Sequence, residues 1–265
     1  GQVWSLNPAG GELVMGHHDG SLLLSASNSR LPSPEPAART FVTMSDEYML
    51  GGTYTGLVLY RKEKGQWVFD RKLDGLKESC RIMVKDEDQS IWISHPYRGV
   101  YNVRWNAGNK DKIDIRFFNQ ENGLPTNLNN YVFQIAGKAV FATEKGVFHF
   151  DRSKDTFVPD DDFNRLLDKQ HRVRYLREDT KGNVWYVTDH EAGMLIVNDF
   201  GLKKEVRKKV IPELAGKLVG GFEFLLPIDG HNMIIGTEQG FIHYALDEED
   251  QSDTLPQIIL SNIIA

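Results

Sequence analysis

The sequence has very little cysteine and no long apolar run. Cys80 is the single cysteine among 265 residues, which excludes an internal disulfide, a cysteine-built zinc site and redox chemistry that needs a cysteine pair. The richest apolar stretches are short pieces such as 221–228, far from the roughly 18 residues that a membrane-spanning helix requires. We therefore expect no segment of this sequence to cross a membrane.

Basic charge is not in excess either. The 37 acidic residues outnumber the 31 lysines and arginines, and the formal net charge of -6 has the wrong sign for a nucleic-acid surface. Hydrophobic residues at 40% and charged residues at 26% match an ordinary globular protein with a proper core. A chain that begins at Gly1 without methionine or signal peptide is typical of an excerpt or a processed product.

What the sequence does contain is a repeat. Its clearest copy is 173–197 (VRYLREDTKGNVWYVTDHEAGMLIV), where alternating strand-like segments are separated by an Asp/Gly turn and a second turn. Five further copies follow the same order at 3–24, 41–60, 81–103, 131–150 and 222–244. More polar segments that suit a fourth strand follow three of the copies, at 66–72, 113–118 and 203–209. Four antiparallel strands in about 45 residues are one propeller blade.

One glycine follows the second turn of every copy. These glycines are Gly20, Gly56, Gly99, Gly146, Gly193 and Gly240, at spacings of 36, 43, 47, 47 and 47 residues. Each is expected to supply the positive φ of a tight hairpin turn. The sequence therefore predicts an all-β fold, a β-propeller of four-stranded antiparallel blades, whose six visible repeats form a six-bladed or a partial seven-bladed ring.

The predicted propeller occupies residues 1–247. Its blades are expected near 3–37, 40–76, 80–124, 130–166, 173–215 and 221–247. The first copy is short, because the proline-rich stretch 31–36 stands where a fourth strand is needed. The only helical candidate lies around 161–169. Residues 248–265 contain an acidic linker and then an apolar strand.

Three segments of the repeat have recognisable motifs, namely the turn 122–127 (NGLPTN), the acidic turn with its tryptophan at 178–185 (EDTKGNVW) and the strand ending at 235–240 (IGTEQG). In these segments the repeat resembles the two-component-regulator propeller repeats in the sensor regions of hybrid histidine kinases of Bacteroidetes. The copies are degenerate. Ser94, Ala142 and Val187 replace the glycine of that strand ending, and 75–77 (GLK) lacks the proline of the first turn.

The resemblance implies a function as well as a fold. Propellers of that family are periplasmic sensor domains that recognise glycan-derived oligosaccharides and signal through a membrane helix to a histidine kinase, usually as homodimers. It also implies that 255–260 (LPQIIL) leads into the immunoglobulin-like three-Y domain. Kinase and phosphoacceptor segments are not visible in this stretch, so we expect it to bind a ligand without catalysis, without a cofactor and without contacting nucleic acid or membrane.

Candidate ligand-binding residues lie in the turns before the six glycines. In a propeller these turns share one face with the connections between blades, and that face is the natural binding surface. The turns contain His17, His18, Asp19, Tyr54, Thr55, Tyr97, Arg98, Glu144, Lys145, Asp189, His190, Glu191, Glu238 and Gln239.

Tyr97 and Arg98 are the best pair among them. A tyrosine ring covers the apolar face of a sugar, and a guanidinium grips a carboxylate or sulfate of an anionic one. His17, Tyr54 and His190 complete the candidate set. The alternative is that all five are ordinary solvated turn residues.

Metal and catalytic interpretations have less support. His17, His18, His95 and His190 could converge on a metal, but none has the fixed local spacing of a metal motif, and no metal is assigned. The acidic triplets 86–88 and 160–162 could cleave a glycosidic bond only if two carboxylates flanked it. A propeller-fold polysaccharide lyase or hydrolase, and a non-catalytic protein-interaction scaffold, remain open as alternatives.

Overall fold

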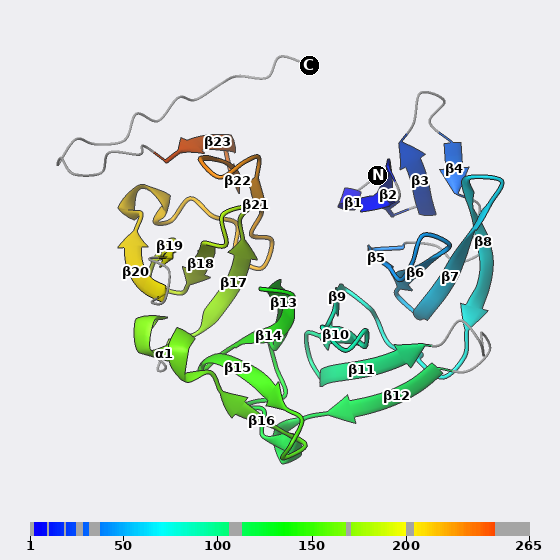
Figure 1. The fold of residues 1–265 in the computed structure, drawn as a ribbon, viewed down its shortest axis with the longest axis horizontal. Coiled ribbons are helices and arrows are strands. Elements are labelled where there is room, and N and C mark those ends of the chain that lie inside the picture. Colours follow the sequence, from blue (N-terminus) through cyan, green and yellow to red (C-terminus); the bar gives the residue numbers. More distant parts are fainter. Residues whose placement is uncertain are drawn as a thin grey trace. The chain divides into compact units, whose positions relative to one another are not determined.

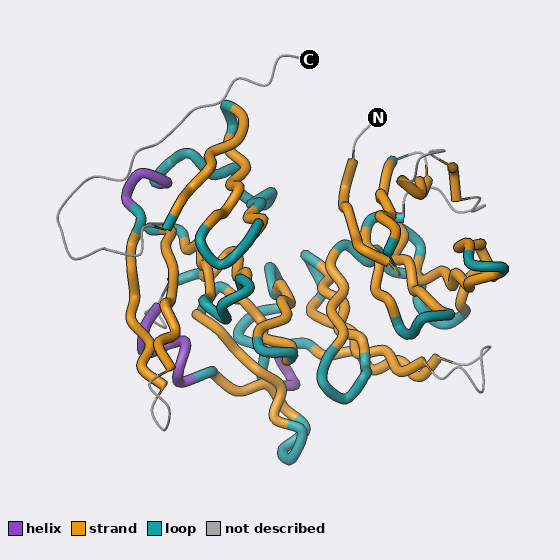
Figure 2. The backbone as a smooth tube through the Cα atoms, turned by 45° about the horizontal axis from the view of Figure 1, so that its top comes forward, coloured by secondary structure: helices purple, strands orange, loops and turns teal. Residues whose placement is uncertain are grey.

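The structure, a computed structural model, is almost entirely β. It describes residues 3–9, 11–18, 20–24, 29–31, 38–105, 113–167, 171–199 and 204–246, in which strands dominate and helix is scarce (Figures 1 and 2). The strands form six antiparallel sheets in chain order, which confirms the predicted β-propeller and gives it six blades. Across these ranges, no helix has the length and apolar character needed to span a membrane.

Consecutive strands form each of the first three blades. Blade 1 contains β1 (Val3–Ala9), β2 (Glu12–His17), β3 (Gly20–Leu24) and β4 (Ser29–Leu31). Blade 2 contains β5 (Thr40–Thr43), β6 (Tyr48–Thr53), β7 (Gly56–Glu63) and β8 (Gln66–Leu73). Blade 3 contains β9 (Ile82–Lys85), β10 (Ile91–His95), β11 (Gly99–Trp105) and β12 (Ile113–Phe118).

The last three blades follow the same plan, with three described strands in the sixth. Blade 4 contains β13 (Tyr131–Ile135), β14 (Lys138–Thr143), β15 (Gly146–Asp151) and β16 (Thr156–Pro159). Blade 5 contains β17 (Val173–Glu178), β18 (Val184–Thr188), β19 (Ala192–Asp199) and β20 (Lys204–Val210). Blade 6 contains β21 (Leu225–Pro227), β22 (Asn232–Thr237) and β23 (Gly240–Ala245).

Short helices follow three of the blades. The α-helix α1 (Asp161–Leu167) comes after blade 4, and the one-turn 3-10 helices η2 (Gln120–Asn122) and η3 (Pro212–Leu214) come after blades 3 and 5. The polar segments expected as fourth strands are β8, β12 and β20. Blade 1 does have a fourth strand, β4, which ends where the proline-rich stretch begins. The linker and strand expected at 248–265 lie outside the described residues.

The chain folds as two compact units. The first comprises Gly1–Thr143 and Phe148–Pro159, and the second comprises Glu144–Val147 and Asp160–Ala265. Within the first unit the innermost strands of successive blades pack against one another, β1 on β5, β5 on β9 and β9 on β13. This is the packing that radial repetition of a blade produces.

The core consists of apolar clusters between neighbouring blades. The second or third residues of five second strands are all buried, namely Met49, Trp92, Val140, Trp185 and Met233. Trp92 is surrounded by aromatic rings of blades 3 and 4, with centroid distances of 5.2 to 5.6 Å to Phe118, Phe141, Phe150 and Phe157. Burial of each such side chain stabilises the fold by about 1.5–3 kcal/mol.

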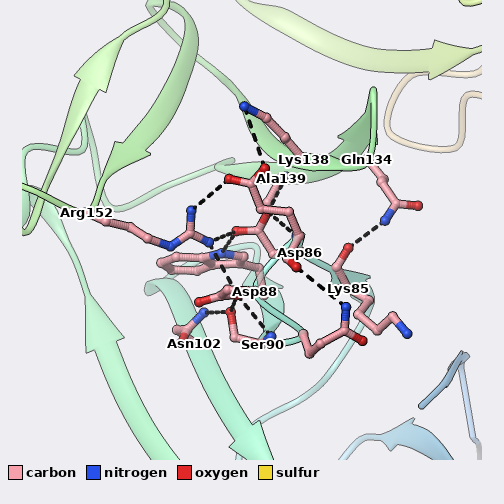
Figure 3. Close-up of polar contacts among 12 residues, drawn as sticks. Lys85, Asp86, Asp88, Ser90, Asn102, Gln134, Lys138, Ala139 and Arg152 are labelled. Carbon is pink, nitrogen blue, oxygen red and sulfur yellow. Dashed lines mark hydrogen bonds and ion pairs between the residues drawn. The ribbon is translucent and has the colours of Figure 1, made fainter. Parts of the chain in front are cut away.

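A buried carboxylate joins blade 3 to blade 4. Asp86 accepts hydrogen bonds from the Trp92 indole at 3.0 Å and from the backbone N–H of Ala139 at 3.0 Å. Arg152 also donates to Asp86, at 2.6 Å, as Figure 3 shows. Because a buried carboxylate needs partners for both of its oxygens, this arrangement fixes the spacing of the two blades.

Candidate ligand-binding face of the first unit

Turns between second and third strands rest on the connections that lead into their own blades. In blade 2, the ring of Tyr54 in the β6–β7 turn lies against Arg39, which precedes β5. In blade 3, Nη1 of Arg98 in the β10–β11 turn donates to Oε1 of Glu78, which precedes β9, at 2.6 Å. Turn and connection therefore lie on one face of each of these blades, as expected for a propeller.

Tyr97 and Arg98 project from this face in blade 3. The residue Tyr97 is 73% exposed and the Arg98 side chain 61% exposed. The backbone N–H of Tyr97 donates to Nδ1 of His95 at 3.2 Å, and the two rings stand 6.2 Å apart. His95 is itself buried, so a fixed imidazole supports the exposed phenol.

Arg98 already has an anionic partner. Glu78 accepts from its Nη1, and the other oxygen of Glu78, Oε2, lies 3.5 Å from Nε2 of His95. The ion pair occupies one guanidinium nitrogen and leaves the rest of the fork for a ligand. Burial lowers the pKa of His95, the Glu78 carboxylate opposes that shift, and Arg98 lowers the pKa further. His95 is consequently neutral near pH 7.

Tyr54 belongs to a different group, which includes two residues that the sequence analysis did not single out. The guanidinium carbon of Arg39 lies 4.7 Å from the centroid of the Tyr54 ring and 4.5 Å from that of Trp4 in β1. These are cation–π distances. Tyr54 is 39% exposed, and Trp4 and Arg39 are half-buried. Arg39 could have been selected from the sequence because it lies in the connection between blades 1 and 2, on the face where ligand-binding residues were expected.

The two candidate histidines lie at the end of β2 and in the β18–β19 turn. His17 is half-buried at the end of β2, where it pairs across the ladders with Val3 and Gly20. His190 is exposed in the second unit, with its ring 4.5 Å from that of His171. The structure thus places Tyr97 and Arg98 next to each other in one turn of blade 3, Tyr54 and His17 in blades 2 and 1 of the same unit, and His190 in the second unit. Asp19 lies outside the described residues.

The turn of blade 5 departs from the predicted register. Thr188 and Glu191 pair across it, through a backbone hydrogen bond of 2.8 Å from Thr188 N–H to the Glu191 carbonyl. Gly193 lies two residues later, opposite Tyr186, and is the one turn glycine without a positive φ. Glycine is required at this position for lack of space and not for a positive φ. A Cβ there would meet the carbonyl oxygen of Lys209 and the Tyr186 hydroxyl.

Glu191 is held by other side chains in this turn. Its Oε1 accepts from the Tyr186 hydroxyl at 3.1 Å and lies 2.5 Å from Nζ of Lys208. Burial raises the pKa of Tyr186, and the neighbouring Glu191 carboxylate raises it further. The turn of blade 5 is therefore stabilised by its own blade.

The three carboxylates of the acidic triplet 86–88 share one cation, Arg152. Asp86, Glu87 and Asp88 all lie within 3.3 Å of Arg152. In the second triplet, Asp160 accepts from the N–H of Phe163 at 3.2 Å at the start of α1. These carboxylates pair with groups of the protein. In the ranges that the structure describes, no three metal-binding side chains form a cluster.

Comparisons with known proteins place the fold among β-propellers. No family model and no curated protein matches the chain. Among solved structures, the extracellular domain of a hybrid two-component system from B. thetaiotaomicron has a TM-score of 0.68 at 17% identity, covering 98% of this chain and 33% of that one. The chain thus spans about a third of that relative's length.

Two shorter propellers are also similar. YCF48 bound to D1 peptide has a TM-score of 0.63 at 13% identity, covering 95% of this chain and 79% of its own. Virginiamycin B lyase from Staphylococcus aureus, in an inactive form with quinupristin, has a TM-score of 0.61 at 10% identity, covering 92% and 80%. At such identities the likeness is one of fold, and function has to be argued from the residues.

Proposed function

We propose that this chain is the ligand-sensing propeller of an extracytoplasmic regulator of the hybrid two-component type. In this proposal it binds a glycan-derived oligosaccharide on the turn face of the first unit and catalyses no reaction. The kinase belongs to another part of a longer periplasm-facing membrane protein. Support comes from the fold that the chain shares with the extracellular domain of such a system.

The exposed pair Tyr97 and Arg98 is the observation on which the ligand class rests. The residue Tyr97 is 73% exposed, and its backbone N–H donates to His95. Because this hydrogen bond already holds the backbone, a sugar that stacks on the ring causes little further loss of backbone entropy. The neighbouring guanidinium adds donors for sugar hydroxyls or an acidic substituent.

Signalling in this proposal is a shift between two arrangements of a homodimer. A ligand moves such an equilibrium only by its difference in affinity for the two states. A turn face made of side chains from successive blades suits this role, because small changes in how the propellers pack alter which of these side chains a ligand can reach.

Isothermal calorimetry with a panel of neutral and acidic oligosaccharides tests the proposal. A bound oligosaccharide should raise the melting temperature of the 265-residue chain, and Tyr97→Ala should weaken binding about tenfold or more, which corresponds to ~1.4 kcal/mol. Arg104→Ala is the matched control, because that side chain is 62% exposed on the same blade and pairs with Asp88. Equal affinity in wild type and Tyr97→Ala would refute the site.

A further inference from the structure

Arg39 lies over two aromatic rings from two blades. Trp4 belongs to β1 of blade 1, and Tyr54 belongs to the β6–β7 turn of blade 2. The guanidinium carbon is 4.5 Å from one centroid and 4.7 Å from the other, and the backbone N–H of Arg39 donates to the Gly52 carbonyl at 2.7 Å. Main chain and side chain are both held, so the guanidinium is oriented before any ligand arrives.

This guanidinium differs from Arg98 in having no carboxylate partner among the described residues. Its Nε is enclosed and has no hydrogen-bond acceptor there, and the same holds for the indole Nε1 of Trp4. By contrast, Arg98 is paired with Glu78. A half-buried cation without a counter-charge is unfavourable, because burial removes part of its hydration.

A second positive charge adds to the effect. Burial lowers the pKa of Arg39, Tyr54 opposes that shift, and the nearby Arg81 lowers the pKa further. Two guanidinium groups in one neighbourhood raise the local electrostatic potential, which attracts anions. An arriving oxyanion would supply the missing counter-charge and accept hydrogen bonds from the guanidinium.

We infer that Arg39, with Trp4 and Tyr54, forms an oxyanion subsite that takes a carboxylate or sulfate group of an acidic sugar. The inference deepens the proposed function, and only the sugar part rests on it. Arg39 is better suited than Arg98 to this group, because the Glu78 carboxylate paired with Arg98 already neutralises that guanidinium and repels a second anion. The indole and phenol rings bordering Arg39 provide apolar surface for the carbon skeleton next to the acidic group.

The test uses the Arg39 Nε–H resonance of the 15N-labelled 265-residue chain, assigned by its loss in Arg39→Lys. Three monosaccharide probes are titrated: methyl glucuronide, glucose 6-sulfate and neutral methyl glucoside. We expect the resonance to move with an anionic probe and to stay unchanged with the neutral one. Movement with only one of the two anionic probes supports the subsite and identifies carboxylate or sulfate as its ligand.

Affinity measurements with the variants complete the test. Arg39→Lys keeps the charge but loses the planar fork, so its affinity for the anionic probe should fall about tenfold. Arg207→Lys is the matched control, because Arg207 is exposed on β20 in the second unit. If Arg39→Lys fails to fold, Tyr54→Leu removes one ring at an exposed turn and should weaken binding several-fold. Equal affinity in the folded variants refutes the subsite.

The result can be separated from that of the sensor proposal. An Arg39 resonance that responds to the anionic probes while no oligosaccharide binds supports the subsite and refutes the sugar sensor. An oligosaccharide that binds through Tyr97 while the Arg39 resonance stays unchanged refutes the subsite and supports the sensor. An equal response to the neutral probe also refutes the subsite.

Discussion

The indole N–H of Trp92 donates a 3.0 Å hydrogen bond to the carboxylate of Asp86, six residues earlier in blade 3. Blade 5 repeats the pair, with Trp185 donating to Asp179 at 3.3 Å. Each carboxylate also accepts a backbone N–H of its own turn. One acidic residue therefore closes the first turn of a blade and permits a tryptophan to be buried without an unsatisfied N–H.

Replacement of Asp86 should destabilise the first unit strongly. Asp86→Ala leaves the Trp92 indole and the Ala139 N–H without their acceptor and Arg152 without its most buried partner. We expect a loss of about 3 kcal/mol in the free energy of unfolding, measured by urea denaturation. Glu87→Gln is the control. That side chain is 49% exposed, so its loss should stay below about 1 kcal/mol. Similar losses in both variants would contradict this role.

The turn glycines should differ in their tolerance of a methyl group. Gly56 has φ +123°, and a Cβ there would meet the carbonyl oxygen of Leu76. Gly65 has φ +83° with open space around it. Gly65→Ala should therefore cost about 1 kcal/mol from backbone strain alone, and Gly56→Ala should cost roughly 3 kcal/mol, since strain and overlap add. Equal decreases in melting temperature for the two variants would contradict this prediction. They would mean that the backbone at Leu76 moves away from the new methyl group at position 56.

Cys80 should remain unreactive while the protein is folded. Burial raises the pKa of its thiol from 9.0 to about 12, with a further contribution from Glu78. A disulfide reagent at pH 8 should label it only as fast as the chain opens. Between pH 9 and 12 the thiol ionises in the unfolded chain before it ionises in the folded protein, so the free energy of unfolding should fall with rising pH. In Cys80→Ala the free energy of unfolding should fall less steeply over the same pH range. Rapid labelling of native protein would contradict the burial.

Removal of Arg98 should raise the pKa of His95. Burial and Arg98 both lower this pKa, and Glu78 raises it, so Arg98→Ala leaves burial as the one effect that opposes the carboxylate. Histidine NMR titration of wild type should show a value below 6.5 and an upward shift in the variant. The neutral imidazole contributes stability that is fully present above the unfolded-state pKa of about 6.5 and is lost as pH falls through the lowered pKa of the folded state. Arg104→Ala should leave the titration unchanged.

Local repetition made the blades predictable. Alternating apolar residues and a glycine after the second turn recur within each copy, and several copies add an acidic first turn, so the strands around Trp92 and Trp185 could be placed from short windows. Gly193 is the exception. Its spacing fitted the period, but only the register opposite Tyr186 shows that it serves close packing rather than a turn.

The candidate site was predictable only in part. Tyr97 and Arg98 were found because they stand in a turn. The pairing of Arg98 with Glu78 and the stacking of Arg39 on Trp4 and Tyr54 depend on how one blade is placed against the next. No periodicity in the sequence encodes those contacts, because the connections between blades are irregular.

The turns between second and third strands contact the connections between blades and lie outside the core, and this has an evolutionary consequence. Side chains such as Tyr97 stand outside the apolar clusters that hold the blades together, so mutation can exchange them at little cost in folding. Selection can therefore retune recognition one hairpin at a time, and grafting a tip from one such protein onto another offers a route to engineered specificities.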